Sequence, residues 1–214
     1  MELTSPLVIG FLASFFLLGV LAFTSFIKIS VVFMITRNAM GLQQVPSNAV
    51  LMALALFLSI YISMPVFSAA SSALLEADIQ PTTVDQFLEL WNIGIAPFQA
   101  FIIANIEGNH LGFFVEISNE LWRGSGLVGT RDDIIIQVPA FIVSELTEAF
   151  ELGFLLYLPF VAIDLAVTGI LMALGMQMVQ PNIIAVPFKL LLFVMIDGWP
   201  KLTQGLLVTY IPVG

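Results

Sequence analysis

The chain has 214 residues, of which 59% are hydrophobic and only 10% are charged. Soluble domains contain about 45–50% apolar residues, so this composition is typical of a protein that lies largely in a membrane. Six basic and fifteen acidic side chains give a net charge of −9, which would repel nucleic-acid phosphates and argues against nucleic acid as a partner. The sequence has no cysteine, which excludes disulfides, thiolate metal sites and cysteine nucleophiles.

Two apolar helices are predicted in the first third of the chain. Residues 7–27 carry no charge and are long enough, at ~1.5 Å per residue, to cross a hydrocarbon core of ~30 Å. This helix is expected to continue through Lys28 toward Arg37. Residues 38–48, which contain glycine, proline and several amides, are typical of a polar turn, and residues 49–70 supply the second helix.

The character of the sequence changes between residues 71 and 133. This stretch carries nine acidic side chains and two arginines, a local charge of −7 that accounts for most of the total. Residues 84–106 mix aromatic and polar side chains, a pattern that favours amphipathic helices, which we expect to be interrupted at Gly94 and Pro97. The stretch is predicted to be a small, mostly helical insert.

A helical hairpin is predicted near the C-terminus. Apolar runs over residues 150–179 and 183–196 are separated by the short polar turn 180–182. The second run has only fourteen residues, whereas about twenty are usual for a crossing. Either it continues through residues 197–199 to Tyr210, or these helices are buried in protein and do not face lipid.

These elements predict an all-α integral membrane protein with three segments. Residues 1–70 form a hydrophobic helical pair, residues 71–139 an acidic and mostly helical insert, and residues 140–214 a hydrophobic hairpin. Because basic residues favour the cytoplasmic side, Arg37 places the turn 38–48 inside the cell and the insert outside it.

Asp164 and Lys189 are the clearest charges within apolar runs. Each costs roughly 2.5–3.5 kcal/mol at the membrane centre and needs a partner or a wet cavity. With the hairpin turning at Pro181, their depths differ by ~12 Å, so an ideal hairpin would keep them apart. Three alternatives remain: kinks at Pro159 and Pro187, pairing between neighbouring copies in a ring, which we favour, or a lysine that snorkels to the membrane surface.

A catalytic reading finds little support. Asp164 and Asp197 could share a proton as in aspartyl proteases, but the residues before Asp197 lack the expected Gly-x-Gly, and a structural or capping role for Asp197 is favoured. His110 is the only histidine and has no neighbouring ligand, so it makes no metal motif. We therefore expect no enzyme, no cofactor and no metal site.

Three methionines, Met172, Met176 and Met178, precede the turn of the hairpin. Such residues are ordinarily core filler. The alternative is that their flexible thioethers form a compliant seal around a pore. Gly175 beside them would allow close helix approach or bending.

Two blocks of the sequence resemble the SctR/FliP family of type III secretion export-gate proteins. The first block consists of FIKISVV at residues 26–32 and RNAMGLQQVPSN at residues 37–48. The second contains Gly153-Phe154, Tyr157-Leu158-Pro159-Phe160, Ile163-Asp164-Leu165, Ala173-Leu174-Gly175-Met176, Pro187-Phe188-Lys189-Leu190 and Asp197-Gly198-Trp199. The acidic middle of the chain carries no shared motif.

The resemblance implies a multi-pass subunit of the bacterial inner membrane, present as a five-membered ring that protrudes to the periplasmic side. It would assemble with SctS/FliQ-like and SctT/FliR-like subunits into a helical funnel, surrounded by SctU/FlhB-like and SctV/FlhA-like subunits. The ring would gate the passage of unfolded substrate proteins, with the C-terminal hairpin lining the pore. Membrane lipid is a further expected partner, and nucleic acid is not.

Carried over by position, the family's methionine gasket falls on Met176 and Met178, and Gln177 departs from an uninterrupted methionine run. The family's intramembrane acid and lysine fall on Asp164 and Lys189. Flagellar relatives often carry a signal peptide that this sequence lacks, so a virulence injectisome is expected. The alternative function is a small-solute or proton-coupled transporter, in which Asp164 would act as a proton relay.

Overall fold

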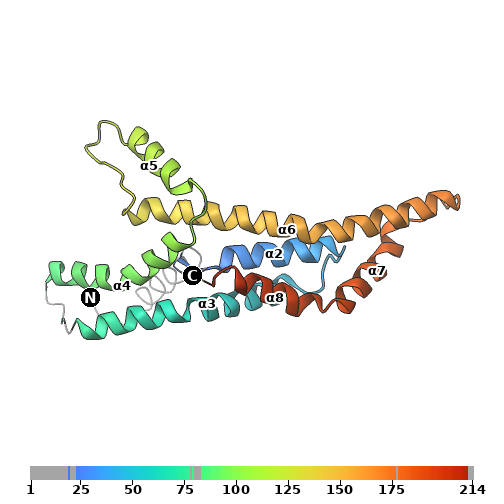
Figure 1. Cartoon of the computed structure of the whole chain (residues 1–214), viewed down its shortest axis with the longest axis horizontal. Coiled ribbons are helices and arrows are strands. Elements are labelled where there is room, and N and C mark those ends of the chain that lie inside the picture. Colours follow the sequence, from blue (N-terminus) through green and yellow to red (C-terminus); the bar gives the residue numbers. More distant parts are fainter. Residues whose placement is uncertain (1–18, 20–22, 78, 80–82, 177, 212–214) are drawn as a thin grey trace, which may run out of the picture. The chain divides into compact units, whose positions relative to one another are not determined.

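The computed structural model describes residues 19, 23–77, 79, 83–176 and 178–211, and these residues form seven helices and no strand (Figure 1). The predicted all-α fold class is confirmed. The helices are α2 (Phe26–Ala39), α3 (Asn48–Glu76), α4 (Val84–Ala104), α5 (His110–Leu121), α6 (Ile134–Ala173), α7 (Pro181–Met195) and α8 (Gly198–Val208).

The chain divides into two compact units. The insert unit comprises the described parts of Met1–Ile27 and Ser59–Leu146, and it contains α4 and α5. The hairpin unit comprises Lys28–Leu58 and the described part of Thr147–Gly214, and it contains α2, α7 and α8. Because α3 and α6 each contribute to both units, the units do not follow the order of the sequence.

Among the described residues, α3, α4 and α6 are each long and apolar enough to cross a membrane. The bent pair α7–α8 meets the same test as one broken span. The helix expected over residues 49–70 is confirmed by α3. Residues from Lys28 to Arg37 are helical in α2, but α2 begins at Phe26 after a bend and a turn at Thr24 and Ser25, so the uninterrupted continuation of the first helix is wrong. Most of the helix expected over residues 7–27 lies outside the described residues. α4 belongs to the acidic insert, where the sequence pattern indicated amphipathic helices.

The expected interruptions at Gly94 and Pro97 are wrong, because α4 is continuous through both. The helix starts at a capping box in which Thr83 and Gln86 exchange hydrogen bonds between side chain and backbone. Within the insert unit the Phe98 ring packs edge-on against Phe67 of α3, with centroids 5.3 Å apart. Packing of this kind overrides the weak helix propensity of single glycine and proline residues.

The helix α6 does not have the bounds predicted from the apolar run over residues 150–179. It begins at Ile134, well before residue 150, and ends at Ala173, before residue 179. The end is a Schellman motif: the N–H of Gly175 donates to the carbonyl of Met172, and the N–H of Met176 to that of Leu171. Gly175 has a φ of 71°, the left-handed conformation that this motif requires and that glycine adopts without strain.

The last two helices are separated by a sharp break. α7 and α8 are bent by 62°, and Asp197 between them has a left-handed backbone with a φ of 53°. Gly198 packs so tightly that a Cβ there would lie 2.4 Å from the Phe193 ring. The fourth apolar run therefore continues past residue 196, as one of the two alternatives proposed, but as a second helix in a new direction.

Candidate functional site

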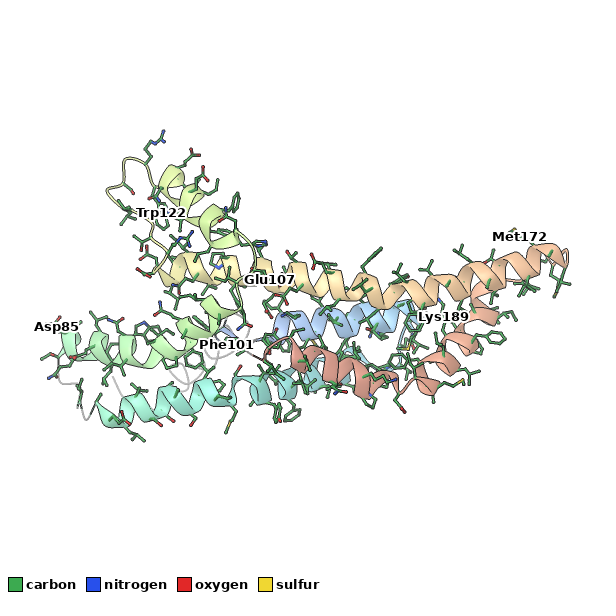
Figure 2. The ribbon with its side chains drawn as sticks, in the orientation of Figure 1. Asp85, Phe101, Glu107, Trp122, Met172 and Lys189 are labelled. Carbon is green, nitrogen blue, oxygen red and sulfur yellow. The ribbon has the colours of Figure 1, made fainter. Side chains whose placement is uncertain are left out.

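A buried lysine joins three helices of the hairpin unit. Lys189 of α7 is only 4% exposed, and Figure 2 labels it on this helix. Its ammonium group donates hydrogen bonds to the backbone oxygen of Ala39, at the end of α2, at 3.1 Å and to Oδ2 of Asp164, on α6, at 2.6 Å. A cation in an apolar helix needs such partners, so snorkelling to a membrane surface does not describe this lysine.

The depth argument that separated Asp164 from Lys189 is wrong. α6 ends at Ala173, nine residues after Asp164, and α7 begins at Pro181, eight residues before Lys189. At ~1.5 Å per residue the two arms have nearly equal lengths. The sequence predicts the turn at Pro181, whereas the Schellman motif ends α6 earlier and leaves a connecting loop before α7. The ion pair thus forms within one chain, and the favoured pairing between copies is not needed to explain it.

Asp164 depends strongly on this lysine. Its Oδ1 atom is buried and accepts no hydrogen bond from the described residues, although the side chain as a whole is 35% exposed. Lys189 therefore supplies its one ion pair in the described part of the chain. Removing Lys189 would leave a partly buried carboxylate uncompensated.

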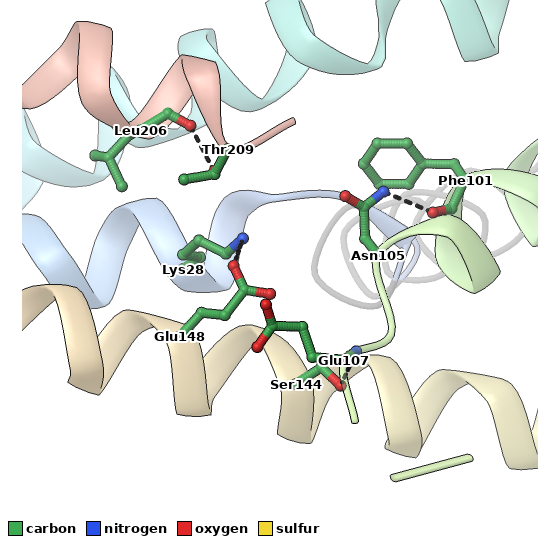
Figure 3. A network of polar contacts seen from close by, with 8 residues as sticks. All are labelled: Lys28, Phe101, Asn105, Glu107, Ser144, Glu148, Leu206 and Thr209. Atoms are coloured by element: carbon green, nitrogen blue, oxygen red, sulfur yellow. Dashed lines mark hydrogen bonds and ion pairs between the residues drawn. The ribbon is translucent and has the colours of Figure 1, made fainter. Parts of the chain in front are cut away.

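A second charge pair lies in the same unit. Lys28 of α2, 1% exposed, lies 2.5 Å from Oε2 of Glu148 on α6, and Figure 3 shows the pair. The Lys28 ammonium also lies 4.1 Å from the centre of the Tyr210 ring, within cation–π range. Sequence analysis singled out Lys28 but missed both partners. This cluster fastens α2 to α6 and to the segment that follows α8.

The two other charged residues singled out have local roles. Nη1 of Arg37 donates to the Pro46 carbonyl at 3.3 Å and to Oδ1 of Asn48, so it holds the polar turn closed against the end of α2. Asp197 occupies the N-cap position of α8, but its carboxylate makes no capping hydrogen bond. Of the structural or capping role expected for Asp197, the side-chain cap is therefore wrong, and the residue contributes the left-handed break in the backbone.

The methionines surround the tip of the hairpin. Met172 lies in the last turn of α6, as Figure 2 shows, and Met176 and Met178 follow in the loop. All three side chains are exposed in the single chain, and Met178 is 98% exposed. Gln177 lies outside the described residues. The tip thus presents flexible apolar side chains that the described residues leave exposed.

The described residues contain no group of three or more histidine or acidic side chains able to hold a metal ion. His110 is the first residue of α5 in the insert unit. The hairpin unit thus contains two ion pairs that join helices, the Arg37 contacts that close the polar turn, and an exposed apolar tip.

Comparisons with known proteins match nearly the whole chain. A model of the FliP family matches residues 8–206. Yop proteins translocation protein R of Yersinia pestis is 42% identical over 210 residues, which cover 98% of this chain and 96% of that protein. The probable translocation protein y4yL of Sinorhizobium fredii is 44% identical over 194 residues, 90% of this chain and 87% of that protein. The virulence protein YscR of Salmonella typhimurium is 41% identical over 191 residues, 88% of each chain.

Proposed function

The chain belongs to the FliP family and is a type III secretion export protein, and from this premise we propose that it forms a gated pore for unfolded proteins in the bacterial inner membrane. The observation that carries the proposal is the nearly full-length similarity to a protein named for the translocation of Yop proteins. A further relative is named as a virulence protein, which supports an injectisome and not a flagellum.

In this proposal five copies form a ring with SctS/FliQ-like and SctT/FliR-like subunits, surrounded by SctU/FlhB-like and SctV/FlhA-like subunits. Residues 140–214 line the pore, and residues 71–139 face the periplasm. Apolar helices long enough to cross a membrane, which the described residues contain, support a multi-pass location. The chain contributes no catalysis, so the energy for export comes from other components.

We assign the seal of the pore to the exposed tip of the hairpin. Met172, Met176 and Met178 are unbranched and polarizable, so they can pack against one another across a ring and yield to side chains of different shapes. Their exposure in the single chain leaves them available to neighbouring copies. A ring of such tips would block ions at rest and deform when a polypeptide enters.

Replacing Met176 and Met178 together by alanine is expected to make the resting apparatus leak. Alanine shortens both side chains, so the ring keeps an opening that the thioethers would fill. We expect a several-fold rise in the inward flux of protons, measured with a pH-sensitive fluorescent protein in the cytoplasm of cells that produce the complete apparatus. Secretion of substrate proteins should continue, because widening the seal does not obstruct them.

Met64→Ala is the matched control for this experiment, because Met64 is equally an exposed methionine but lies on α3 in the insert unit. It should leave the proton flux unchanged. The double variant could instead show an unchanged proton flux while the apparatus assembles to its normal level. That result would mean that the methionines of the tip do not seal the pore, and it would count against the gated pore.

A further inference from the structure

The first half of α4 exposes a row of apolar side chains. This α4 stripe, within residues 84–91, consists of Val84, Phe87, Leu88 and Trp91, each more than half exposed. These positions recur at the spacing of one helix face. A different side of α4 packs within the insert unit, where a Cβ at Gly94 would lie 3.4 Å from the Leu74 side chain of α3. Contiguous exposed apolar patches mark contact sites, so the stripe is a surface for a partner.

A second exposed apolar surface lies at the end of α5 and on the loop that follows it. This loop surface, within residues 121–131, consists of Leu121, Leu127 and Val128, which are 76%, 64% and 73% exposed. The side chain of Asn119 fixes the loop: the Gly129 N–H donates to its Oδ1 at 2.9 Å, and its Nδ2 donates to the Gly129 carbonyl at 3.0 Å. A loop held in this way loses little conformational freedom on binding.

The two surfaces carry opposite charges. The segment of the α4 stripe contains two acids, Asp85 and Glu89, and no base. The segment of the loop surface contains two bases, Arg123 and Arg131, and no acid. Both arginines are exposed and form no ion pair with the residues that the structure describes. Figure 2 labels Asp85 at the start of α4 and Trp122 where the loop begins. The stripe and the loop surface are thus both apolar and complementary in charge.

We propose that the loop surface of one copy docks on the α4 stripe of the next copy, with the arginines of the first beside the acids of the second. Both surfaces are exposed in the single chain, so a copy does not cover its own stripe. Because the two complementary surfaces belong to one chain, a second copy is sufficient to cover either of them. Such a contact is heterologous and leaves each copy one surface for a further neighbour, which is how rings are built.

Crosslinking tests this contact directly, because the chain has no cysteine of its own. One tagged form carries Leu88→Cys, and a second, differently tagged form carries Val128→Cys. Both are produced together with the neighbouring export-apparatus subunits, and the membranes are treated with a short bismaleimide. We expect a product that contains both tags. Two forms that carry the same substitution should give no product, because the contact joins different surfaces.

Met64→Cys is the matched control for Leu88→Cys. Met64 is 62% exposed and lies on α3 in the insert unit, outside both surfaces. Combined with Val128→Cys, it should give no product. A product as strong as that of Leu88→Cys would show random encounters in the membrane and would overturn the proposal.

Charge reversal shows whether the arginines direct the docking. Arg123→Glu with Arg131→Glu, in both tagged forms, should lower the product roughly tenfold or more, because like charges then face each other. Adding Asp85→Arg and Glu89→Arg should restore it, which a misfolded insert would not allow. Arg123→Met alone should change little, because a single exposed ion pair contributes little. A product that the reversal leaves unchanged would contradict the docking.

The outcomes separate this contact from the proposed function, on which it rests for the ring. If the two cysteine forms enter the complete assembly but give no product, the docking is overturned and the export gate stands. Failure of Leu88→Cys to react with a water-soluble maleimide would then show that lipid or another subunit covers the stripe. If the product forms in copies that do not incorporate the neighbouring subunits, the docking is supported and the export gate is contradicted.

Discussion

Replacing Lys189 by methionine is expected to abolish secretion by preventing stable folding of the hairpin unit. Methionine keeps a linear side chain but removes the ion pair to Asp164 and the hydrogen bond to Ala39. Breaking a buried pair from one side costs about 3–5 kcal/mol, and the 35% exposure of the Asp164 side chain favours the lower value. Since domains are stable by only about 5–15 kcal/mol, such a loss is severe. The readouts are the monodisperse fraction after detergent extraction and the amount of secreted substrate.

A double variant shows whether Asp164 is structural or carries protons. Lys189→Met with Asp164→Leu removes both charges, and replacing a buried pair by apolar residues is often neutral. We expect assembly and secretion to return together. If the double variant assembles but does not transport, Asp164 takes part in transport itself, as a proton-coupled transporter would require. Arg123→Met, an exposed arginine of the insert unit, is the control and should have little effect.

Glu148→Leu is expected to destabilise the hairpin unit by about 3–5 kcal/mol, because it deprives the nearly inaccessible Lys28 of its carboxylate. The group left behind is Lys28, whose side chain is only 1% exposed, so solvent compensates less here than at the 35% exposed Asp164. The measurement is the temperature at which the detergent-solubilised protein loses its helical circular dichroism. The double variant Lys28→Met with Glu148→Leu should recover most of the lost stability, because it leaves no unpaired charge at this pair.

Glu151→Leu is the matched control for this prediction. Glu151 lies three residues further along α6, is exposed, and has no ion pair with the described residues. The same substitution there removes the same charge from the same helix, so a small effect is expected. Equal destabilisation by Glu148→Leu and Glu151→Leu would contradict the Lys28 cluster as a structural element.

Hydropathy predicted the helix content well, because membrane helices must be long and apolar to satisfy their backbone in lipid. It could not predict where α6 begins, since acidic residues such as Glu148 interrupt the apolar run while the helix continues. Whether an acid faces solvent or a buried lysine depends on the opposite helix. For this reason the sequence singled out Lys28 but not its partners.

The register of the hairpin was predictable in principle from Gly175. A glycine shortly before a Gln-Pro turn is the usual signal for a helix C-terminus, and with it the two arms of the hairpin have equal lengths. Interpreted as a site of close helix approach or bending, Gly175 does not mark the helix end, and a turn placed at Pro181 then keeps Asp164 and Lys189 apart. Identifying the two charges required only that they lie in apolar runs, whereas pairing them required the correct end of α6.

Native mass spectrometry of the detergent-extracted protein tests the central claim, that this chain is a ring-forming subunit of an export gate. The chain would be produced once alone and once together with the neighbouring export-apparatus subunits of the same bacterium. We expect a discrete assembly containing five copies of the chain that incorporates SctS/FliQ-like and SctT/FliR-like subunits. A stable monomer or dimer that ignores those subunits would contradict the account.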